Sequence, residues 1–491
     1  MKMKPISKFV MGIMFGAIAT LGIYSFADDS IASSSHENIS SSIPVDEINN
    51  FAKVYALTKN YYVESVPDTK LMKGAINGML TNLDPHSGYL DAKDFKDLTE
   101  MTNGSFAGLG IEVSREKDDA VKVVAPIDGT PAYYAGIKSG DYIVKIDGQL
   151  VSDMTLDKAI QKMRGKAGTK VTITISRKNE LQPINITITR AIIKIESIKS
   201  TMLNKDYGYI RITNFQADTV NGLVNALNNL YKTNPHLKGL VLDLRDDPGG
   251  LLQSAVGVVS SFVPKDSLVV YTRGRIENSD HKFYASFKDY ALDDDKTDLV
   301  AKVPALFKTI PLVVLVNQGT ASASEIVSGA LQDYKRAKII GTKTFGKGSV
   351  QTVIPLSEDT AVKLTTALYF TPKGRSIQAE GIKPDIIVRS EYNDLNDSWD
   401  LSEASLDHHL SNPTSIVVSK DKNNTPIISP PQITTQAQLK ATLKRKLALT
   451  PKVEQQGVAH IDLANDFQLK WALNILEGVP LPKQTTTKIE K

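Results

Sequence analysis

One short stretch, an apolar run that ends in a tight turn and then a helix, constrains the fold more than any other part of the sequence. The run is residues 312–316, Leu-Val-Val-Leu-Val, and Asn-Gln-Gly-Thr-Ala-Ser-Ala-Ser-Glu-Ile follows it. Beyond the turn, apolar residues recur at the helical spacings of three and four: Ile326, Val327, Ala330, Leu331 and Tyr334. This pattern predicts a buried strand, a sharp turn and a helix that begins at Ser322.

Ser322 has two interpretations at this position. A serine on a sharp turn is exposed, and the N–H group of Ala323 would have no acceptor within the helix. Because this is the positive end of the helix, such an N–H can stabilise a developing oxyanion. The residues Ser322-Ala-Ser-Glu325 also match a capping box, in which the serine only closes the helix end. Taken alone, capping is the commoner use of a serine at a helix start.

A lysine flanked by glycines favours the first interpretation. Residues 345–351 read Phe-Gly-Lys-Gly-Ser-Val-Gln and lead into another strand-like run. Together with Gly-Thr-Ala-Ser-Ala-Ser-Glu-Ile, this motif resembles the carboxy-terminal processing peptidases, also called tail-specific proteases, which are PDZ-containing serine peptidases with a Ser-Lys dyad. The resemblance extends from about Val45 to Val388. It implies that Ser322 is the nucleophile, that Lys347 is the general base and that Gln351 supports the lysine.

The loop Asp-Asp-Pro-Gly-Gly at residues 246–250 also has two interpretations. It follows a predicted strand that ends in Asp-Leu-Arg, and as a bare pattern it is only a tight turn before a helix. In the peptidases that the chain resembles, this loop supplies one N–H of the oxyanion hole, so the implied pair of donors is Gly249 and Ala323. That family more often has asparagine where this chain has Asp246 and Asp247. Carboxylates there would oppose a developing negative charge.

The order of elements in residues 104–190 resembles a PDZ domain, because short alternating runs are interrupted by two helical segments, 131–135 and 156–163. Residues 106–111, Phe-Ala-Gly-Leu-Gly-Ile, resemble the PDZ loop that binds a peptide carboxylate, since glycines let N–H groups turn toward an anion. The residues expected to bind the peptide are Gly108, Leu109, Gly110 and Ile111. Arg164, which ends the second helical segment, either couples peptide binding to the active site, as in some members of the family, or only suits a helix C-terminus.

The other boundaries follow from composition and periodicity. Residues 1–27 have a basic start, an apolar stretch and a small-x-small site, which is typical of a cleaved signal peptide, although the stretch is long enough for an uncleaved anchor. A flexible spacer, 28–44, and an N-terminal helical segment, 45–103, are predicted next. Strands alternate with helices over 195–388, which indicates an α/β peptidase core, crotonase- or ClpP-like by resemblance. A polar linker, 389–435, and a C-terminal helical extension, 436–491, complete the chain.

Lysine must lose its proton before it can act as a base, and its ordinary pKa is about 10.4. Burial would lower that pKa, and a neutral glutamine can orient the amine without raising the pKa again, as a carboxylate would. His86, which follows a proline in a turn, is interpreted as a surface or packing residue rather than a catalytic base, because Lys347 already fills the role of base. Ser324 is the rival nucleophile, but it would face away from Ser322 on the helix.

Composition narrows the classes of function. The formal net charge is +4, and three of those charges belong to lysines of the leader, so bulk charge does not support nucleic-acid binding. No zinc motif or phosphate loop is present, and the predicted chemistry needs no metal or cofactor. We therefore expect an exported endopeptidase, periplasmic or otherwise extracytoplasmic and tethered to the inner membrane if the leader is kept. Its substrates would be proteins with accessible C-termini, in processing or quality control.

Two other classes of function stay open from the sequence. One is a peptide-binding PDZ adaptor or chaperone whose peptidase site is silent, and the other is a crotonase-type acyl-CoA enzyme suggested by fold alone. An intact set of Ser322, Lys347 and Gln351 argues against the adaptor. The need for a delivery adaptor and the formation of a homo-oligomer through the terminal helical regions are likewise left open.

Overall fold

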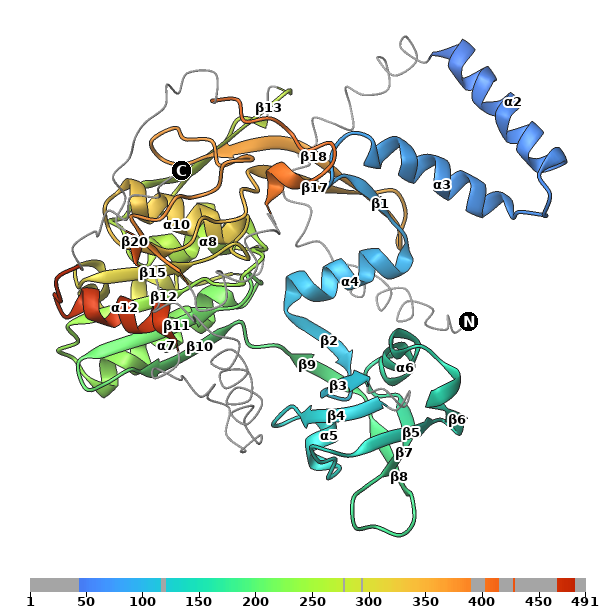
Figure 1. Ribbon diagram of the computed structural model, residues 1–491, viewed down its shortest axis with the longest axis horizontal. Coiled ribbons are helices and arrows are strands. Elements are labelled where there is room, and N and C mark those ends of the chain that lie inside the picture. The colour runs from blue at the N-terminus through green and yellow to red at the C-terminus, as the bar shows by residue number, and fades with distance from the viewer. Residues whose placement is uncertain are drawn as a thin grey trace, which may run out of the picture.

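The computed structural model describes residues 44–115, 121–276, 279–292, 295–389, 402–414, 427–428 and 466–481. Three helices come first, α2 (Val45–Tyr61), α3 (Asp68–Thr81) and α4 (Ala92–Asn103). A small β-rich domain and then a larger α/β core follow them along the chain (Figure 1). Two antiparallel strands, β2 (Ser105–Gly108) and β9 (Ala191–Lys194), form a ribbon where the chain enters and leaves the small domain.

A seven-stranded sheet forms the centre of the core, and all neighbouring strands except the first pair are parallel. Its strands in spatial order are β10 (Ile198–Met202), β11 (Tyr207–Ile212), β12 (Gly239–Asp243), β15 (Leu312–Val316), β16 (Lys338–Gly341), β19 (Ile386–Val388) and β20 (Ile427–Ile428). Every residue of β12 and β15 is buried, as expected for apolar strands of a parallel sheet that is covered on both faces.

Helices cover both faces of this sheet. Side chains alternate along a strand, so Leu240 and Leu242 of β12 point to one face and Val241 points to the other. The first face packs against α7 (Thr219–Thr233), α8 (Leu252–Ser260) and α10 (Ala323–Asp333). The second face packs against α12 (Phe467–Leu476), through Leu469 and Ala472.

A second, antiparallel sheet carries the strand that follows Lys347. Its strands are β1 (Gly88–Leu90), β13 (Leu268–Gly274), β14 (Lys282–Tyr284), β17 (Ser349–Pro355) and β18 (Ala361–Phe370). This sheet contacts α8 and α10, and the short α9 (Phe287–Tyr290) follows β14. Because β1 pairs with β18, the N-terminal helical segment is joined to the core beside the lysine loop.

The small domain has a hydrophobic core of its own. Its sheet contains β3 (Ile111–Arg115), β4 (Val121–Pro126), β5 (Tyr142–Ile146), β6 (Gln149–Leu150), β7 (Lys170–Ser176) and β8 (Ile184–Thr189), and its helices are α5 (Pro131–Tyr134) and α6 (Leu156–Met163). The predicted strands and helices of this domain therefore form, with ends displaced by a few residues at most.

Several predicted segments lie wholly or partly outside the described residues. The leader and nearly all of the spacer, 1–43, are among them, and so are residues 436–465 of the predicted C-terminal helical extension. Within the described residues, no helix has both the length and the apolar character needed to cross a membrane. The predicted linker differs where it is described: residues 402–414 lie against the core, with Ser402, Glu403 and Asn412 buried, because their polar atoms are satisfied there by hydrogen bonds.

Helix α12 is held to the sheet by charge as well as by apolar contact. Arg245, directly after β12, contacts the Asp243 carboxylate at 2.6 Å and the Asp466 carboxylate at 2.6 Å. Asp466 also caps α12, because its carboxylate accepts the Leu469 N–H at 2.9 Å.

Replacing Leu469 should therefore destabilise the core. Leu469 is 1% exposed, so Leu469→Ala is expected to lower the free energy of unfolding by about 2–5 kcal/mol through lost burial and a cavity. Urea unfolding followed by circular dichroism measures this change. Lys470→Ala, at the exposed neighbouring position, is the matched control and should change stability by less than about 0.5 kcal/mol. Equal effects of the two variants would contradict the docking of α12.

Candidate active site

The turn between β15 and α10 places Ser322 at the helix start, as the sequence predicts. Its backbone has φ 55° and ψ −115°, a strained conformation for a residue other than glycine, which is typical of functional sites. The turn is held by Thr320, whose hydroxyl donates to the Leu244 carbonyl at 2.7 Å and accepts from the Asn317 N–H at 3.0 Å. The position of Ser322, the nucleophile candidate, is thus fixed by the ends of two adjacent buried strands, β12 and β15.

Glu325 joins this helix start to the loop that carries Lys347. One carboxylate oxygen, Oε2, accepts the Ser322 N–H at 3.0 Å and the Lys347 N–H at 2.9 Å. The other, Oε1, accepts the Gly346 N–H at 2.8 Å and the Thr344 hydroxyl. Ser322 and Glu325 do form the predicted capping box, and the same carboxylate fixes the loop of the candidate base. The two interpretations of the serine motif are therefore compatible.

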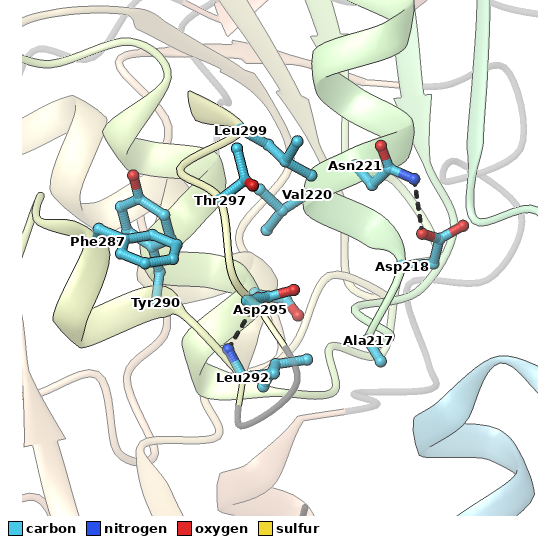
Figure 2. A pocket seen from close by; sticks show the side chains of 11 residues that line it. Ala217, Asp218, Val220, Asn221, Phe287, Tyr290, Leu292, Asp295, Thr297 and Leu299 are labelled. Carbon is cyan, nitrogen blue, oxygen red and sulfur yellow. Dashed lines mark hydrogen bonds between the residues drawn. The ribbon is translucent and has the colours of Figure 1, made fainter. Parts of the chain in front are cut away.

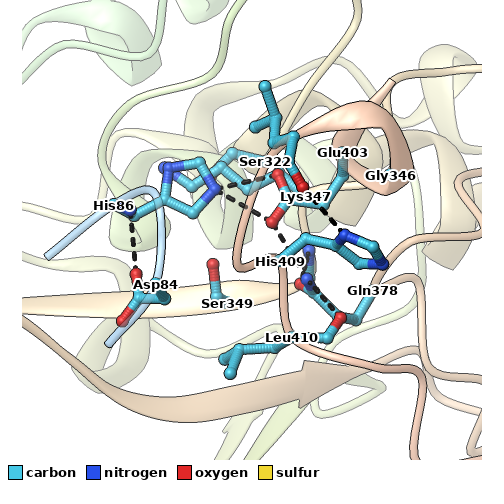
Figure 3. A network of polar contacts seen from close by, with 12 residues as sticks. Asp84, His86, Ser322, Gly346, Lys347, Ser349, Gln378, Glu403, His409 and Leu410 are labelled. Atoms are coloured by element: carbon cyan, nitrogen blue, oxygen red, sulfur yellow. Dashed lines mark hydrogen bonds and ion pairs between the residues drawn. The ribbon is translucent and has the colours of Figure 1, made fainter. Parts of the chain in front are cut away.

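Tyr369 on β18 provides a second link between the two catalytic candidates. Its hydroxyl contacts the Ser322 carbonyl at 3.1 Å and donates to the Lys347 carbonyl. Ser322 and Lys347 lie in one network of polar contacts in Figure 3, although they come from different sheets. The backbones of both residues are consequently held in a common frame by Glu325 and Tyr369.

The environment of the Lys347 side chain favours the neutral amine. Burial lowers the pKa of Lys347 to about 8, and the charge of Lys363 acts in the same direction. The carboxylates of Glu403, Glu325 and Asp84 oppose this shift without reversing it. No hydrogen bond or ion pair of the Lys347 amine occurs within the part of the chain that the structure describes. A lysine in this state can accept a proton near neutral pH.

Gly249 and Ala323 lie together beside Ser322. Gly249 has φ +96°, and a Cβ there would come within 2.8 Å of both the Ala323 nitrogen and the Ser322 Cβ. Only glycine therefore lets the loop approach so closely. The Ala323 N–H donates no hydrogen bond within the described residues, whereas the Gly249 N–H donates to Asp247 Oδ1 at 2.9 Å.

Gln351 lies on β17 and makes no hydrogen bond to Lys347. Its Nε2 donates to the Ser349 hydroxyl at 3.0 Å and to the Thr365 hydroxyl at 3.2 Å. Among the described residues its Oε1 has no hydrogen-bond donor. The amide oxygen is therefore available to an amine, and the support of Lys347 by Gln351 stays a prediction.

Glu403 is a residue that sequence reasoning missed. It lies in a short 3-10 turn, Glu403–Ser405, inside the predicted linker, and it is fully buried. Burial alone would raise its pKa, but hydrogen bonds from His86 and Gln378 hold the pKa of Glu403 below its usual value. The pattern Ser-Glu-Ala-Ser at 402–405, with a serine at each end of the turn, was the only local signal.

His86 contacts Glu403, and its side chain is only partly exposed to solvent. Its Nε2 lies 3.0 and 2.8 Å from the two Glu403 oxygens, as Figure 3 shows. The turn that carries His86 is held by Asp84, whose carboxylate accepts the His86 and Ser87 N–H groups at 2.8 and 2.9 Å. His86 thus bridges the N-terminal segment to the strap formed by residues 402–414.

The predicted carboxylate-binding loop is shaped as a PDZ loop requires. Leu109 is 3% exposed, and Gly110 has φ +77°, with Thr130 so close that a Cβ would lie 2.4 Å from it. The N–H groups of Leu109 and Gly110 donate no hydrogen bond within the described chain. Gly108 and Ile111 flank them on β2 and β3. Two free N–H groups in such a loop can bind an anion.

Arg164 contacts helix α4 and the loop, not the catalytic candidates. Its guanidinium lies 2.9 Å from Glu100 and 3.3 Å from Asp97, and it stacks over the Phe106 ring at 4.9 Å from the centroid. Arg164 therefore connects the peptide-binding loop of the small domain to α4. The structure brings Ser322, Lys347, Gly249 and Ala323 together and leaves Arg164 in the small domain.

A separate pocket lies between the start of α7 and the segment after α9. Its lining includes Asp218 and Asn221 at the start of α7 and Phe287 and Tyr290 of α9. Figure 2 shows these together with Leu292, Asp295, Thr297 and Leu299. None of the predicted site residues lines this pocket.

Comparison with known protein families agrees with this architecture. The model of peptidase family S41 matches residues 206–388, and a PDZ domain model matches residues 122–177. A model of the N-terminal domain of the activating protease CtpB matches residues 11–94. The fold and these matches define the class as an S41 serine-type peptidase with a PDZ domain.

Curated relatives narrow the class. The chain is 46% identical over 368 residues to the carboxy-terminal-processing protease of Bartonella bacilliformis. That alignment covers 74% of this chain and 80% of the relative. The chain is 37% identical over 335 residues to the carboxy-terminal processing protease CtpA of Bacillus subtilis, covering 68% and 67%. A solved structure of a photosystem II D1 C-terminal processing protease shares 30% identity and a TM-score of 0.39, covering 69% and 86%. The chain belongs to the carboxy-terminal processing protease family.

Removing the Glu325 carboxylate should disable the site. Glu325→Ala leaves four buried donors without their acceptor, so we expect a loss of about 3 kcal/mol or more in the free energy of unfolding. We also expect activity to fall about 100-fold, since small displacements of catalytic groups are that costly. Urea unfolding and a peptide-cleavage assay measure the two effects. The exposed Glu358→Ala is the control, and wild-type activity with wild-type stability in Glu325→Ala would contradict this role.

Proposed function

We propose that the chain is an exported serine endopeptidase that recognises protein C-termini through its PDZ domain and cleaves by a Ser322–Lys347 acyl-enzyme mechanism. The observation that carries this proposal is the partly buried Lys347 side chain, whose pKa burial lowers to about 8, in one polar network with a strained Ser322. Such a pair is an activated nucleophile and its base. Family membership supports peptidase activity on protein substrates.

The proposed reaction is acyl transfer in two stages. The neutral Lys347 amine takes the Ser322 proton as the hydroxyl oxygen attacks the peptide carbonyl, and the resulting ammonium returns that proton to the leaving amine. The N–H groups of Ala323 and Gly249 stabilise the oxyanion. Water, deprotonated by the same lysine, then releases the acyl group. Gln351 orients the amine through its unoccupied Oε1.

The PDZ domain supplies recognition in this proposal. A free C-terminal carboxylate binds the N–H groups of Leu109 and Gly110, and the peptide adds as a strand to the domain's sheet. Cleavage then takes place upstream of the bound end. In this scheme the PDZ domain selects the substrate by its C-terminus, and the peptidase site cuts the same chain upstream of that end.

Export and self-association are parts of the same proposal. The signal-peptide pattern of residues 1–27 supports a periplasmic or extracytoplasmic location, tethered to the inner membrane if the leader is kept. Helix α2 supports a homo-oligomer, because its apolar side chains are exposed and available to a second copy. The exposed residues are Val45, Ile48, Phe51, Val54, Leu57 and Tyr61.

Labelling with a fluorophosphonate probe tests the nucleophile and the base. Ser322→Ala and Lys347→Ala should each abolish labelling and cleavage of an unfolded protein substrate. Ser324→Ala is the control, because Ser324 is fully buried and donates to the Asp247 carbonyl at 3.0 Å. Loss of activity in Ser324→Ala alone would contradict the assignment. An unlabelled wild type that still binds peptides would instead indicate an adaptor.

The pH dependence tests the neutral amine directly. Below the pKa of about 8, the neutral fraction of Lys347 falls about tenfold per pH unit, so log kcat/KM should rise with a slope of one between about pH 5.5 and 7. Lys347→Arg should be inactive throughout, because arginine stays protonated. A rate that is independent of pH in this range would rule out Lys347 as the base.

Amidating the substrate C-terminus tests recognition by the PDZ domain. The amide removes the negative charge that the loop N–H groups bind, so we expect kcat/KM for a peptide that spans both sites to fall about tenfold or more. A short peptide that reaches only Ser322 is the matched control and should be indifferent to amidation. Equal losses for both peptides would argue that the carboxylate is not read by the PDZ domain.

A further inference from the structure

The Gly249 N–H, one of the two proposed oxyanion donors, is already engaged within the protein. It donates to Asp247 Oδ1 at 2.9 Å. Asp247 itself is held in place from α10, because its carbonyl accepts the Ala321 N–H at 3.0 Å and the Ser324 hydroxyl at 3.0 Å. The carboxyl group is therefore a fixed competitor for this donor, seated at the start of the helix that carries Ser322.

The carboxyl group of Asp247 is buried without a counter-ion. Asp247 is 0% exposed, and its Oδ2 has no hydrogen-bond partner among the residues that the structure describes. Its acidic neighbours are partnered by arginines: Asp243 contacts Arg245 at 2.6 Å, and Asp246 lies 3.8 Å from Arg211. Asp247 forms no ion pair within the described residues. A buried, half-satisfied carboxyl of this kind is costly as an anion and less costly as a neutral acid.

We propose that Asp247 controls the oxyanion hole: its ionised carboxylate retains the Gly249 N–H, and its protonated form releases that donor to the substrate oxyanion. A carboxylate binds an N–H about twice as strongly as a neutral acceptor does, and it also repels a second negative charge nearby. A neutral carboxyl is the weaker acceptor, so the oxyanion can replace it. Asp247 acts through Gly249 and is a positioning residue for the reaction.

Burial, together with the surrounding charges, places the titration of Asp247 near neutral pH. Burial raises the pKa of Asp247 to about 7, and the Asp243 carboxylate acts in the same direction. The Gly249 N–H, the Ser324 hydroxyl and the charge of Arg211 oppose this rise without reversing it. From α10, Glu325 directs its carboxylate to the N–H groups of Ser322 and Lys347. Asp247 must keep its proton to release the Gly249 N–H, whereas Lys347 must lose its proton to act as the base. The Lys347 amine is neutral only at higher pH.

The two requirements together predict the shape of the pH–rate profile. Because Asp247 must be protonated while Lys347 must be neutral, wild-type kcat/KM rises up to about pH 7 and falls above about pH 8. Asp247→Asn keeps the size of the side chain and removes its charge. In this variant the fall disappears, and the rate rises to a plateau above about pH 8.

The ratio of variant to wild-type kcat/KM is the decisive measurement. We expect a ratio near one at pH 6 and about 100 at pH 9, where about 1% of Asp247 is protonated. Glu325, whose pKa burial raises to about 7, titrates in both proteins and cancels in the ratio. Asp246→Asn, in the same loop but exposed, is the control and should give a ratio near one at every pH.

This inference rests on the proposed function, and the two fail in different ways. If the fluorophosphonate does not label Ser322, the proposed function fails. If labelling is normal but the Asp247→Asn ratio stays flat from pH 6 to 9, only the control by Asp247 is overturned. Should Asp247→Asn not fold, the wild type decides alone: a rate that does not fall between pH 8 and 9.5, with the fold intact by circular dichroism, also overturns it.

Discussion

A single buried carboxylate, that of Glu325, holds the two halves of the site together. Ser322 lies at the start of α10, after β15 of the central sheet, and Lys347 lies in the loop before β17 of the antiparallel sheet. Among the described strands these two sheets are not paired with each other, so no strand pairing fixes the relative position of the two residues. Glu325 accepts the N–H groups of both residues through one oxygen, and Tyr369 binds both of their carbonyls. Because each of these bonds is at least partly buried, a shift of either sheet would leave polar groups with poor access to water and without their partners, which is costly.

Burial also shifts the pKa values of the ionisable groups in the site toward their neutral forms. The pKa values of Glu325 and Asp247 rise to about 7 and that of Lys347 falls to about 8, in each case mainly because burial disfavours the charged form. When a carboxyl group has a higher pKa in the folded state than in the unfolded state, the free energy of unfolding of the protein falls as pH rises. The fall takes place between the usual pKa near 4 and the raised pKa of about 7. The fold is thus less stable near neutral pH than it would be if these groups kept their ordinary pKa values, and such shifts are common at functional sites.

Whether a feature of the fold or the site could be predicted from the sequence depends on how far apart along the chain the contacting residues lie. The strand-turn-helix at Ser322 and the strands β5, β8 and β15 follow from local periodicity, and the structure confirms them. The Glu325 link to Lys347 spans only 22 residues, yet the capping pattern hid it, because one carboxylate serves both purposes. The His86–Glu403 contact spans 317 residues and includes a turn of three, so no periodicity marks it.

Coupling between the two domains has a narrow physical route. The ribbon of β2 and β9 and the helix α4 link the small domain to the rest of the chain, and β2 leads directly into the carboxylate-binding loop. Arg164 pairs with Glu100 of α4 and stacks on Phe106 of β2, which goes beyond the interaction of a cation with its own helix end. A carboxylate bound at the loop would place a new negative charge near this guanidinium and compete with Glu100 for it. Peptide binding and the position of α4 would then be linked through one arginine, without any change in the core that holds Ser322 and Lys347.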